Sequence, residues 1–220
     1  MVKATLNHRG ELDVTVGIEL GSTDKVIELE DQAQSLGATA IILTTPFGSA
    51  VSQQRMKQHF IDVHSIFPGR LWIYHERPLS DNDMSLNTLL EVSSLPRVQG
   101  IKDSTETDTL WRIRDQFEKL GVTLYRGMES KLMSGDTEDC NLVSIANLEP
   151  ELCHQATYAK HDIQLKQNIE RKIAEHQLQK DDWYRYIKQS LAKRKVIKTD
   201  KLINEHEVEW NVKSETSISA

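Results

Sequence analysis

The chain has 220 residues, enough to bury one sizeable core, so we expect one domain. Asp and Glu (33) outnumber Lys and Arg (27), and the formal net charge of −6 argues against a nucleic-acid-binding surface, which needs clustered, uncompensated basic residues. No run approaches the roughly 20 apolar residues of a membrane helix, and the N-terminus lacks the apolar core of a secretion signal. Only two cysteines occur. We therefore expect a cytoplasmic protein that binds neither nucleic acid nor membrane and has no metal site.

Short apolar runs alternate with helical patterns from Asp13 to about Asn147. Several runs are rich in Val and Ile, which is typical of strands buried on both faces of a parallel sheet. The connections are long enough for crossover helices, so we expect one α/β domain with parallel strands in sequence order, curved as a partial barrel. The six predicted strands cover residues 14–20, 39–45, 71–75, 98–102, 122–126 and 142–146.

Helices are predicted from their start and stop signals. Ser22 or Thr23 can cap a helix that runs to Leu36, and Gly37 then supplies a left-handed stop. Gly121 is expected to stop the last helix between strands in the same way. The remaining helices of this region are predicted over residues 51–66, 86–94 and 107–120.

The last third of the chain has a different pattern. Residues 150–158 and a long stretch from Asp162 to about Arg194 are predicted to be wholly helical, because apolar residues recur there at helical spacing among many charges. The end of the chain is polar and rich in Ser and Thr, as disordered tails are. We therefore expect a partial barrel over residues 1–150, a helical extension of the same domain over 151–203, and a disordered tail over 204–220.

Two residues with side chains that can take part in catalysis, Tyr74 and Lys102, stand at the C-terminal ends of consecutive predicted strands. Neighbouring parallel strands lie about 5 Å apart, so the two side chains are expected to converge at the sheet edge where parallel α/β folds place their active sites. Desolvation lowers the pKa of a lysine, and the free amine can attack a keto carbon. A phenol beside it can relay protons as the imine forms. Taken singly, such a lysine more often reaches into solvent, and such a tyrosine more often packs with its hydroxyl at the surface.

The runs that contain these residues carry a family resemblance. Lys102 stands within Gly100-Ile101-Lys102-Asp103-Ser104, and Tyr74 follows Ile73 and precedes Pro78. Together with five further runs, these two resemble the dihydrodipicolinate synthase and N-acetylneuraminate lyase family of Schiff-base aldolases. The runs occur in the order of the family and cover roughly residues 13–200. The other runs are Val16-Gly17, Gly21-Ser22-Thr23, Thr44-Thr45-Pro46-Phe47, Tyr125-Arg126-Gly127-Met128-Glu129 and Val143-Ser144-Ile145-Ala146-Asn147.

The resemblance implies a (β/α)8 TIM barrel with extra C-terminal helices. It further implies a lyase that makes or breaks a carbon–carbon bond, in which Lys102 forms an imine with pyruvate or a related 2-oxo acid and Tyr74 relays protons. Thr45, Gly127 and Val143 match positions of the substrate site. The second substrate would be an aldehyde, the protein a homo-oligomer, and neither a metal nor an organic cofactor would be needed.

Two other residues are candidates for substrate binding, and each also has an alternative role outside the site. Arg77 follows the tyrosine strand and could pair with a substrate carboxylate, or it could be an exposed loop charge. Glu129 could be a polar site residue, or it could cap a short helix. His59 and His64 lie five residues apart, off the spacing that shares a helix face, so we expect both at the surface rather than in a metal site.

The sequence also departs from the family pattern. The first two β-α units have no counterpart, and no Gly-Thr-Thr-Gly-Glu run, which in the family holds the substrate carboxylate, is present. Two hypotheses of different class therefore stand. The chain is a Schiff-base lyase, or it is a barrel remnant that serves as an interaction or regulatory subunit.

Overall fold

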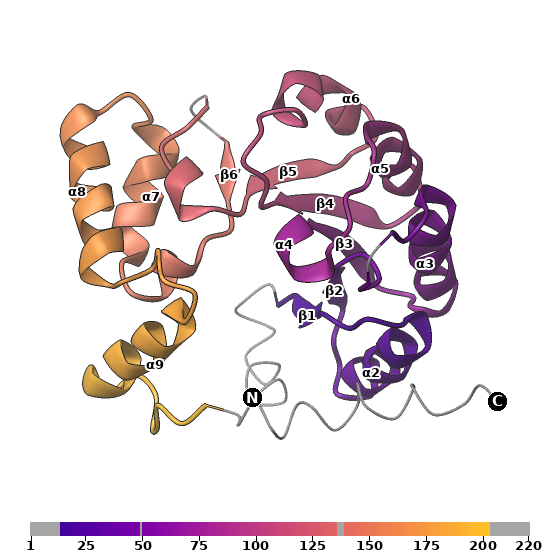
Figure 1. Cartoon of the computed structure of the whole chain (residues 1–220), viewed down its shortest axis with the longest axis horizontal. Coiled ribbons are helices and arrows are strands. Elements are labelled where there is room, and N and C mark those ends of the chain that lie inside the picture. Colours follow the sequence, from indigo (N-terminus) through magenta and orange to yellow (C-terminus); the bar gives the residue numbers. More distant parts are fainter. Residues whose placement is uncertain (1–13, 49, 136–138, 203–220) are drawn as a thin grey trace. The chain divides into compact units, whose positions relative to one another are not determined.

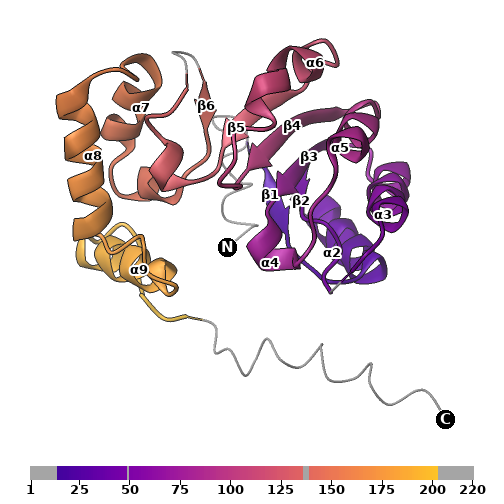
Figure 2. The same cartoon turned by 45° about the horizontal axis from the view of Figure 1, so that its top comes forward.

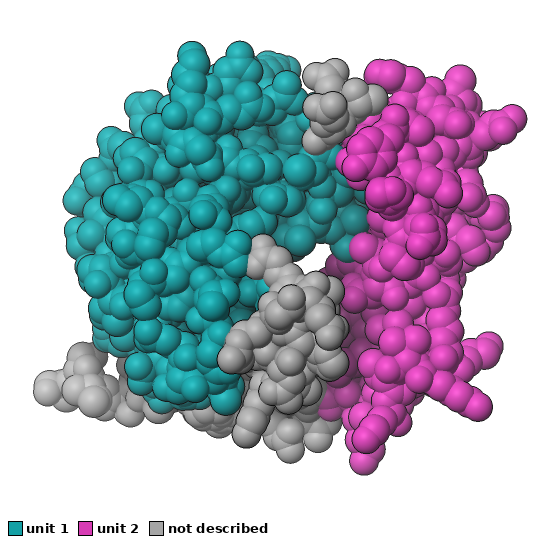
Figure 3. Space-filling view, turned by 180° about the vertical axis from the view of Figure 1, so that it is seen from behind, with its two compact units in different colours: residues 1–143 teal, residues 144–220 magenta. Residues whose placement is uncertain are grey.

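The computed structural model describes residues 14–48, 50–135 and 139–202. The chain divides into two compact units, Met1–Val143 and Ser144–Ala220, coloured teal and magenta in Figure 3. The tail predicted over residues 204–220 lies outside the described residues. The placement of residues 151–203 in one domain with the barrel stays a prediction.

The first unit is built on one six-stranded sheet whose strands are all parallel and follow the order of the chain (Figure 1). This confirms the predicted α/β architecture and strand order. Among the described residues the sheet is open, since the first strand pairs only with the second and the last only with the fifth. The strands are β1 (Val16–Ile18), β2 (Ala40–Leu43), β3 (Arg70–His75), β4 (Val98–Asp103), β5 (Thr123–Arg126) and β6 (Cys140–Asn141).

The prediction of the sixth strand at residues 142–146 is wrong. Strand β6 ends at Asn141, and Ser144–Asn147 form the 3-10 helix η3 instead. In that turn Ile145 is fully buried, and the Asn147 side-chain amide donates to the Ser144 carbonyl. A short apolar run has the same composition in a strand and in a buried helical turn, so its periodicity could not separate the two.

Helices cover one face of the sheet, side by side in Figures 1 and 2. Each of the first three long helices begins after a serine whose hydroxyl accepts a hydrogen bond from the backbone N–H three residues on, at Ser22, Ser52 and Ser85. The helix predicted over residues 107–120 is shorter than expected, and a short helix after β3 was not predicted. The helices are α2 (Thr23–Ser35), α3 (Gln53–Ile66), α4 (Arg77–Ser80), α5 (Leu86–Ser93), η1 (Trp111–Ile113), α6 (Arg114–Glu118) and η2 (Glu129–Lys131).

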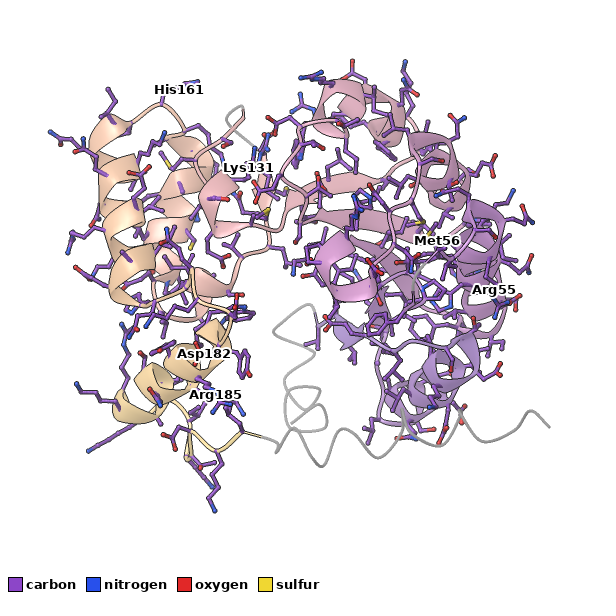
Figure 4. All side chains as sticks on the ribbon, in the orientation of Figure 1. Arg55, Met56, Lys131, His161, Asp182 and Arg185 are labelled. Carbon is purple, nitrogen blue, oxygen red and sulfur yellow. The ribbon has the colours of Figure 1, made fainter. Side chains whose placement is uncertain are left out.

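The main core lies between the sheet and helices α2, α3, α5 and α6. Ile73 of β3 and Ile101 of β4 are fully buried in it, together with Met56 of α3. Figure 4 labels Met56 beside the exposed Arg55, so these two neighbouring residues of α3 face the core and the solvent respectively. The surface position expected for His59 is wrong. It is fully buried, its Nδ1 lies 3.0 Å from the Thr23 hydroxyl oxygen, and burial lowers its pKa to about 4.

The second unit is helical over its described residues. It contains η3, α7 (Pro150–Tyr158), α8 (Ile163–Glu175) and α9 (Trp183–Lys193). The prediction that the stretch from Asp162 to about Arg194 is wholly helical is wrong between α8 and α9, because α8 ends in a Schellman turn in which Gln177 takes a left-handed φ of 56°. The Leu178 N–H bonds back to the Ile173 carbonyl at 3.0 Å, and the Leu178 side chain is buried. Across the described residues, none of the helices has the length and apolar character needed to cross a membrane.

Candidate active site

Tyr74 and Lys102 are direct neighbours across β3 and β4. Successive residues of a strand face opposite sides, so the pair Ile73 and Ile101 points into the helix-covered core while Tyr74 and Lys102 point to the other side of the sheet. There the Lys102 Nζ lies 3.9 Å from the centre of the Tyr74 ring. The Tyr74 and Lys102 side chains therefore converge at this edge of the sheet, as predicted from the strand ends.

The Lys102 amine is half-buried and surrounded by acidic side chains. Burial lowers its pKa from the ordinary value, and the charges of Glu19, Glu76 and Glu129 oppose that shift. Glu19 follows β1, Glu76 follows β3, and Glu129 begins η2 after β5, so all three come from the carboxyl ends of parallel strands. Glu19 remains solvent-accessible, yet partial burial raises its pKa, which Lys102 opposes and Glu76 reinforces. The site therefore holds an amine whose free form is favoured by burial.

The Tyr74 phenol is held by a carboxylate. Its hydroxyl donates to Glu76 Oε2 at 2.9 Å. Burial and the charge of Glu76 raise the pKa of Tyr74 well above its ordinary value. The phenol is therefore protonated at neutral pH and can exchange protons with a neighbour without resting as a phenolate.

Gly127 lies against the lysine side chain. A Cβ built at this position would overlap the Ser104 hydroxyl and lie 3.0 Å from both Cε and Cγ of Lys102. The Gly127 N–H also donates to the Asp103 carbonyl at 2.8 Å, which fixes the loop after β5 against β4. The absence of a side chain at Gly127 thus makes the space in which the Lys102 stem lies.

We expect Gly127→Ala to lower the free energy of unfolding by about 1–3 kcal/mol, the usual cost of inserting a methyl group into a packed site. Urea unfolding at neutral pH measures it. Gly17→Ala is the matched control on β1, because a Cβ there would meet only Ile42 Cγ2, at an ordinary 3.8 Å. Equal stability of the two variants would contradict the tight packing of Gly127 on Lys102.

The other predicted site residues have different surroundings. Thr45 is buried, and its hydroxyl donates to the Ser80 hydroxyl at 2.7 Å, so it is engaged within the protein. Arg77 begins α4 and is exposed, and its charge acts on Asp83. Val143 is half-buried just after β6. The structure thus groups Lys102 with Tyr74, Gly127 and Glu129, and roles of Thr45, Arg77 and Val143 in substrate binding stay predictions.

Sequence reasoning missed an ionic network directly behind the site. His75 Nδ1 lies 3.3 Å from Asp103 Oδ1, and His75 Nε2 lies 2.8 Å from Asp83 Oδ1. Burial alone would lower the pKa of His75, but the two carboxylates outweigh it and raise that pKa to about 9. His75 and Asp103 directly follow Tyr74 and Lys102, so strand alternation puts them on the opposite face, and this alternation is the signal that could have found them.

A second buried ionic group was also missed, at the end of β5 next to Gly127. The Arg126 guanidinium is buried and pairs with Asp139 at 3.1 Å and with Asp108 at 3.2 Å. It also lies 3.8 Å from the ring of Trp111. Lys131, labelled in Figure 4, adds a longer contact of 3.7 Å to Asp108. This group fixes the loop that carries Gly127.

Within residues 14–48, 50–135 and 139–202, no group of three or more His, Cys, Asp or Glu side chains is arranged to hold a metal ion.

Comparison with known proteins gives one consistent family. The family model described as "Dihydrodipicolinate synthetase family" matches residues 1–203. A 4-hydroxy-tetrahydrodipicolinate synthase from Bradyrhizobium diazoefficiens is 28% identical over 152 residues, which cover 67% of this chain and 50% of that relative. The chain thus spans about half the length of the curated relatives it matches.

Solved structures show the same fold. A dihydrodipicolinate synthase from Bacteroides thetaiotaomicron superposes with a TM-score of 0.77 at 19% identity, covering 93% of this chain and 73% of that one. A prophage protein of the dihydrodipicolinic acid synthase family from E. coli K12, solved in complex with pyruvate, gives 0.74 at 18% identity, covering 93% and 72%. The strands, their order and these superpositions confirm the predicted TIM-barrel type of fold.

Proposed function

Because the chain belongs to the dihydrodipicolinate synthetase family, we propose that it is a Schiff-base-forming lyase of the aldolase type that acts on pyruvate or a related 2-oxo acid. The observation that carries the proposal is the half-buried Lys102 amine, 3.9 Å from the centre of the Tyr74 ring. Lys102 is the nucleophile and Tyr74 relays protons.

The chemistry follows from the environment of the amine. Burial lowers the pKa of Lys102, which increases the fraction of free amine that can attack a keto carbon. The protonated imine then withdraws electrons and stabilises a carbanion at the adjacent carbon, as iminium electron sinks do. That carbanion adds to an aldehyde in one direction and is released by carbon–carbon cleavage in the other.

The relatives support this choice of substrate. The Bradyrhizobium diazoefficiens relative is a 4-hydroxy-tetrahydrodipicolinate synthase, and the E. coli K12 structure holds pyruvate. The identity of the aldehyde, a homo-oligomeric state and a cytoplasmic location stay predictions.

We expect one reduced pyruvate adduct when the protein is incubated with pyruvate and borohydride, because hydride converts an imine into a stable secondary amine. Intact-mass spectrometry counts the adducts, and peptide mapping is expected to place the adduct on the peptide that contains Lys102. Circular dichroism shows that the sample is folded. A folded sample without an adduct at saturating pyruvate would contradict the proposal and favour the alternative of an interaction or regulatory subunit.

A further inference from the structure

The hydrogen bond between Tyr74 and Glu76 fixes where the phenol proton points. A phenol carries one proton, and that proton points at Glu76 Oε2, 2.9 Å away. The phenol oxygen also interacts with the Ser104 hydroxyl, which lowers the pKa of Tyr74, and its remaining lone pair can accept a proton from another group. The two residues are two positions apart where β3 runs out into extended chain, and an extended backbone puts alternate side chains on the same side.

We propose that Glu76 is the proton reservoir of the imine-forming reaction, taking up and returning a proton through the Tyr74 hydroxyl. The inference rests on the function proposed above. Glu76 acts through Tyr74 and is therefore a positioning and relay residue for the phenol. Glu76 lies between Tyr74 and Pro78 and is not one of the residues that carry the family resemblance.

Each step balances in protons and electrons. Lys102 begins as an ammonium; the Tyr74 oxygen accepts one of its protons while the Tyr74 proton passes to Glu76, which leaves a free amine and a neutral carboxyl. The nitrogen forms a bond to the keto carbon as the carbonyl π bond breaks, and the oxygen takes a proton from the nitrogen to give the carbinolamine. The Glu76 proton then returns through Tyr74 to the carbinolamine hydroxyl, the C–O bond breaks, and water leaves as the nitrogen lone pair completes the iminium. Ammonium and ketone have become iminium and water, and Glu76 is again a carboxylate.

The surrounding charges distinguish Glu76 from its acidic neighbours. Glu19, Glu76 and Glu129 all act on the Lys102 amine through their charges. Glu76 in addition bonds the phenol and, after burial, is the main charge that raises the pKa of Tyr74, with a smaller contribution from Glu19. A carboxylate that binds the phenol and faces the ammonium is placed to exchange a proton between them.

The test is the rate of borohydride trapping with pyruvate in Glu76→Gln. Its amide carbonyl can still accept the Tyr74 hydrogen bond but cannot take up a proton, so we expect the rate at saturating pyruvate to fall about 100-fold, within the usual range for proton-transfer catalysis. The half-saturating pyruvate concentration is expected to stay within about twofold, because binding is not altered. Glu76→Ala is expected to be similarly slow and to regain rate when acetate or formate is added. A purely structural role would not respond to an added carboxylate.

Coupling to Tyr74 separates the relay from a charge effect. Glu76→Gln is expected to add no further loss to Tyr74→Phe, whereas the losses in Glu19→Gln and Tyr74→Phe are expected to multiply. Glu91→Gln, at an exposed ion pair with Lys57, is the control without effect. Trapping by Glu76→Gln at the wild-type rate, or no rescue of Glu76→Ala by acetate, overturns the relay alone. No adduct in the folded wild-type protein overturns the proposed function together with the relay.

Discussion

Lys102→Arg is expected to abolish the reduced pyruvate adduct completely. A guanidinium stays protonated in proteins, so it keeps the charge beside Glu19, Glu76 and Glu129 but cannot attack a keto carbon. Intact mass after borohydride reduction measures the loss. Tyr74→Phe is expected to form the adduct more slowly than the wild-type protein but not to prevent it, because the nucleophile remains.

The matched control is Lys57→Arg, made at a partly exposed lysine that pairs with Glu91 at 2.6 Å. It is expected to trap pyruvate like the wild-type protein. An adduct of unchanged yield in Lys102→Arg would mean that another amine reacts, and the assignment of Lys102 would be lost.

Asp103→Ala is expected to cost about 3 kcal/mol of the free energy of unfolding at neutral pH, because it leaves the buried His75 imidazolium with one carboxylate instead of two. The Asp103 carboxylate is buried and also accepts hydrogen bonds from the Thr105 hydroxyl at 2.8 Å and from Trp111 Nε1 at 3.2 Å. Urea unfolding measures the loss. Glu91→Ala, at the exposed pair, is expected to change stability by less than about 1 kcal/mol.

The pH dependence of this loss has a defined sign. The folded-state pKa of His75 is raised to about 9 from the ordinary 6.5, so protonated His75 stabilises the fold fully below pH 6.5, and that contribution disappears as the pH rises through 9. The stability difference between wild type and Asp103→Ala should therefore be largest at or below pH 6.5 and should shrink toward pH 9. A difference that grows over this interval would contradict a charged His75.

The sequence alone predicted the helix ends that are formed by glycine. Gly37 and Gly121 stop α2 and α6 with φ of 93° and 75°, as predicted, because glycine enters the left-handed region without a steric penalty. Gln177 ends α8 in the same geometry, at a φ of 56°, and was missed. A glutamine adopts this conformation at a cost, and the burial of Leu178 that accompanies the turn is visible only in the folded unit.

By itself the sequence determined the parallel sheet, its strand order and the pairing of Tyr74 with Lys102. Buried parallel strands need continuous apolar runs, and consecutive β-α units place their carboxyl ends at one edge. Only the tertiary structure decided which polar groups meet there. Glu19, Glu76 and Glu129 come from three strand ends that are distant in the chain, and the His75 network forms on the opposite face of the same strands. The meeting of the three glutamates depends on loop geometry and side-chain packing across elements, which no local pattern of residues encodes, whereas strand alternation already implied that His75 and Asp103 share the opposite face.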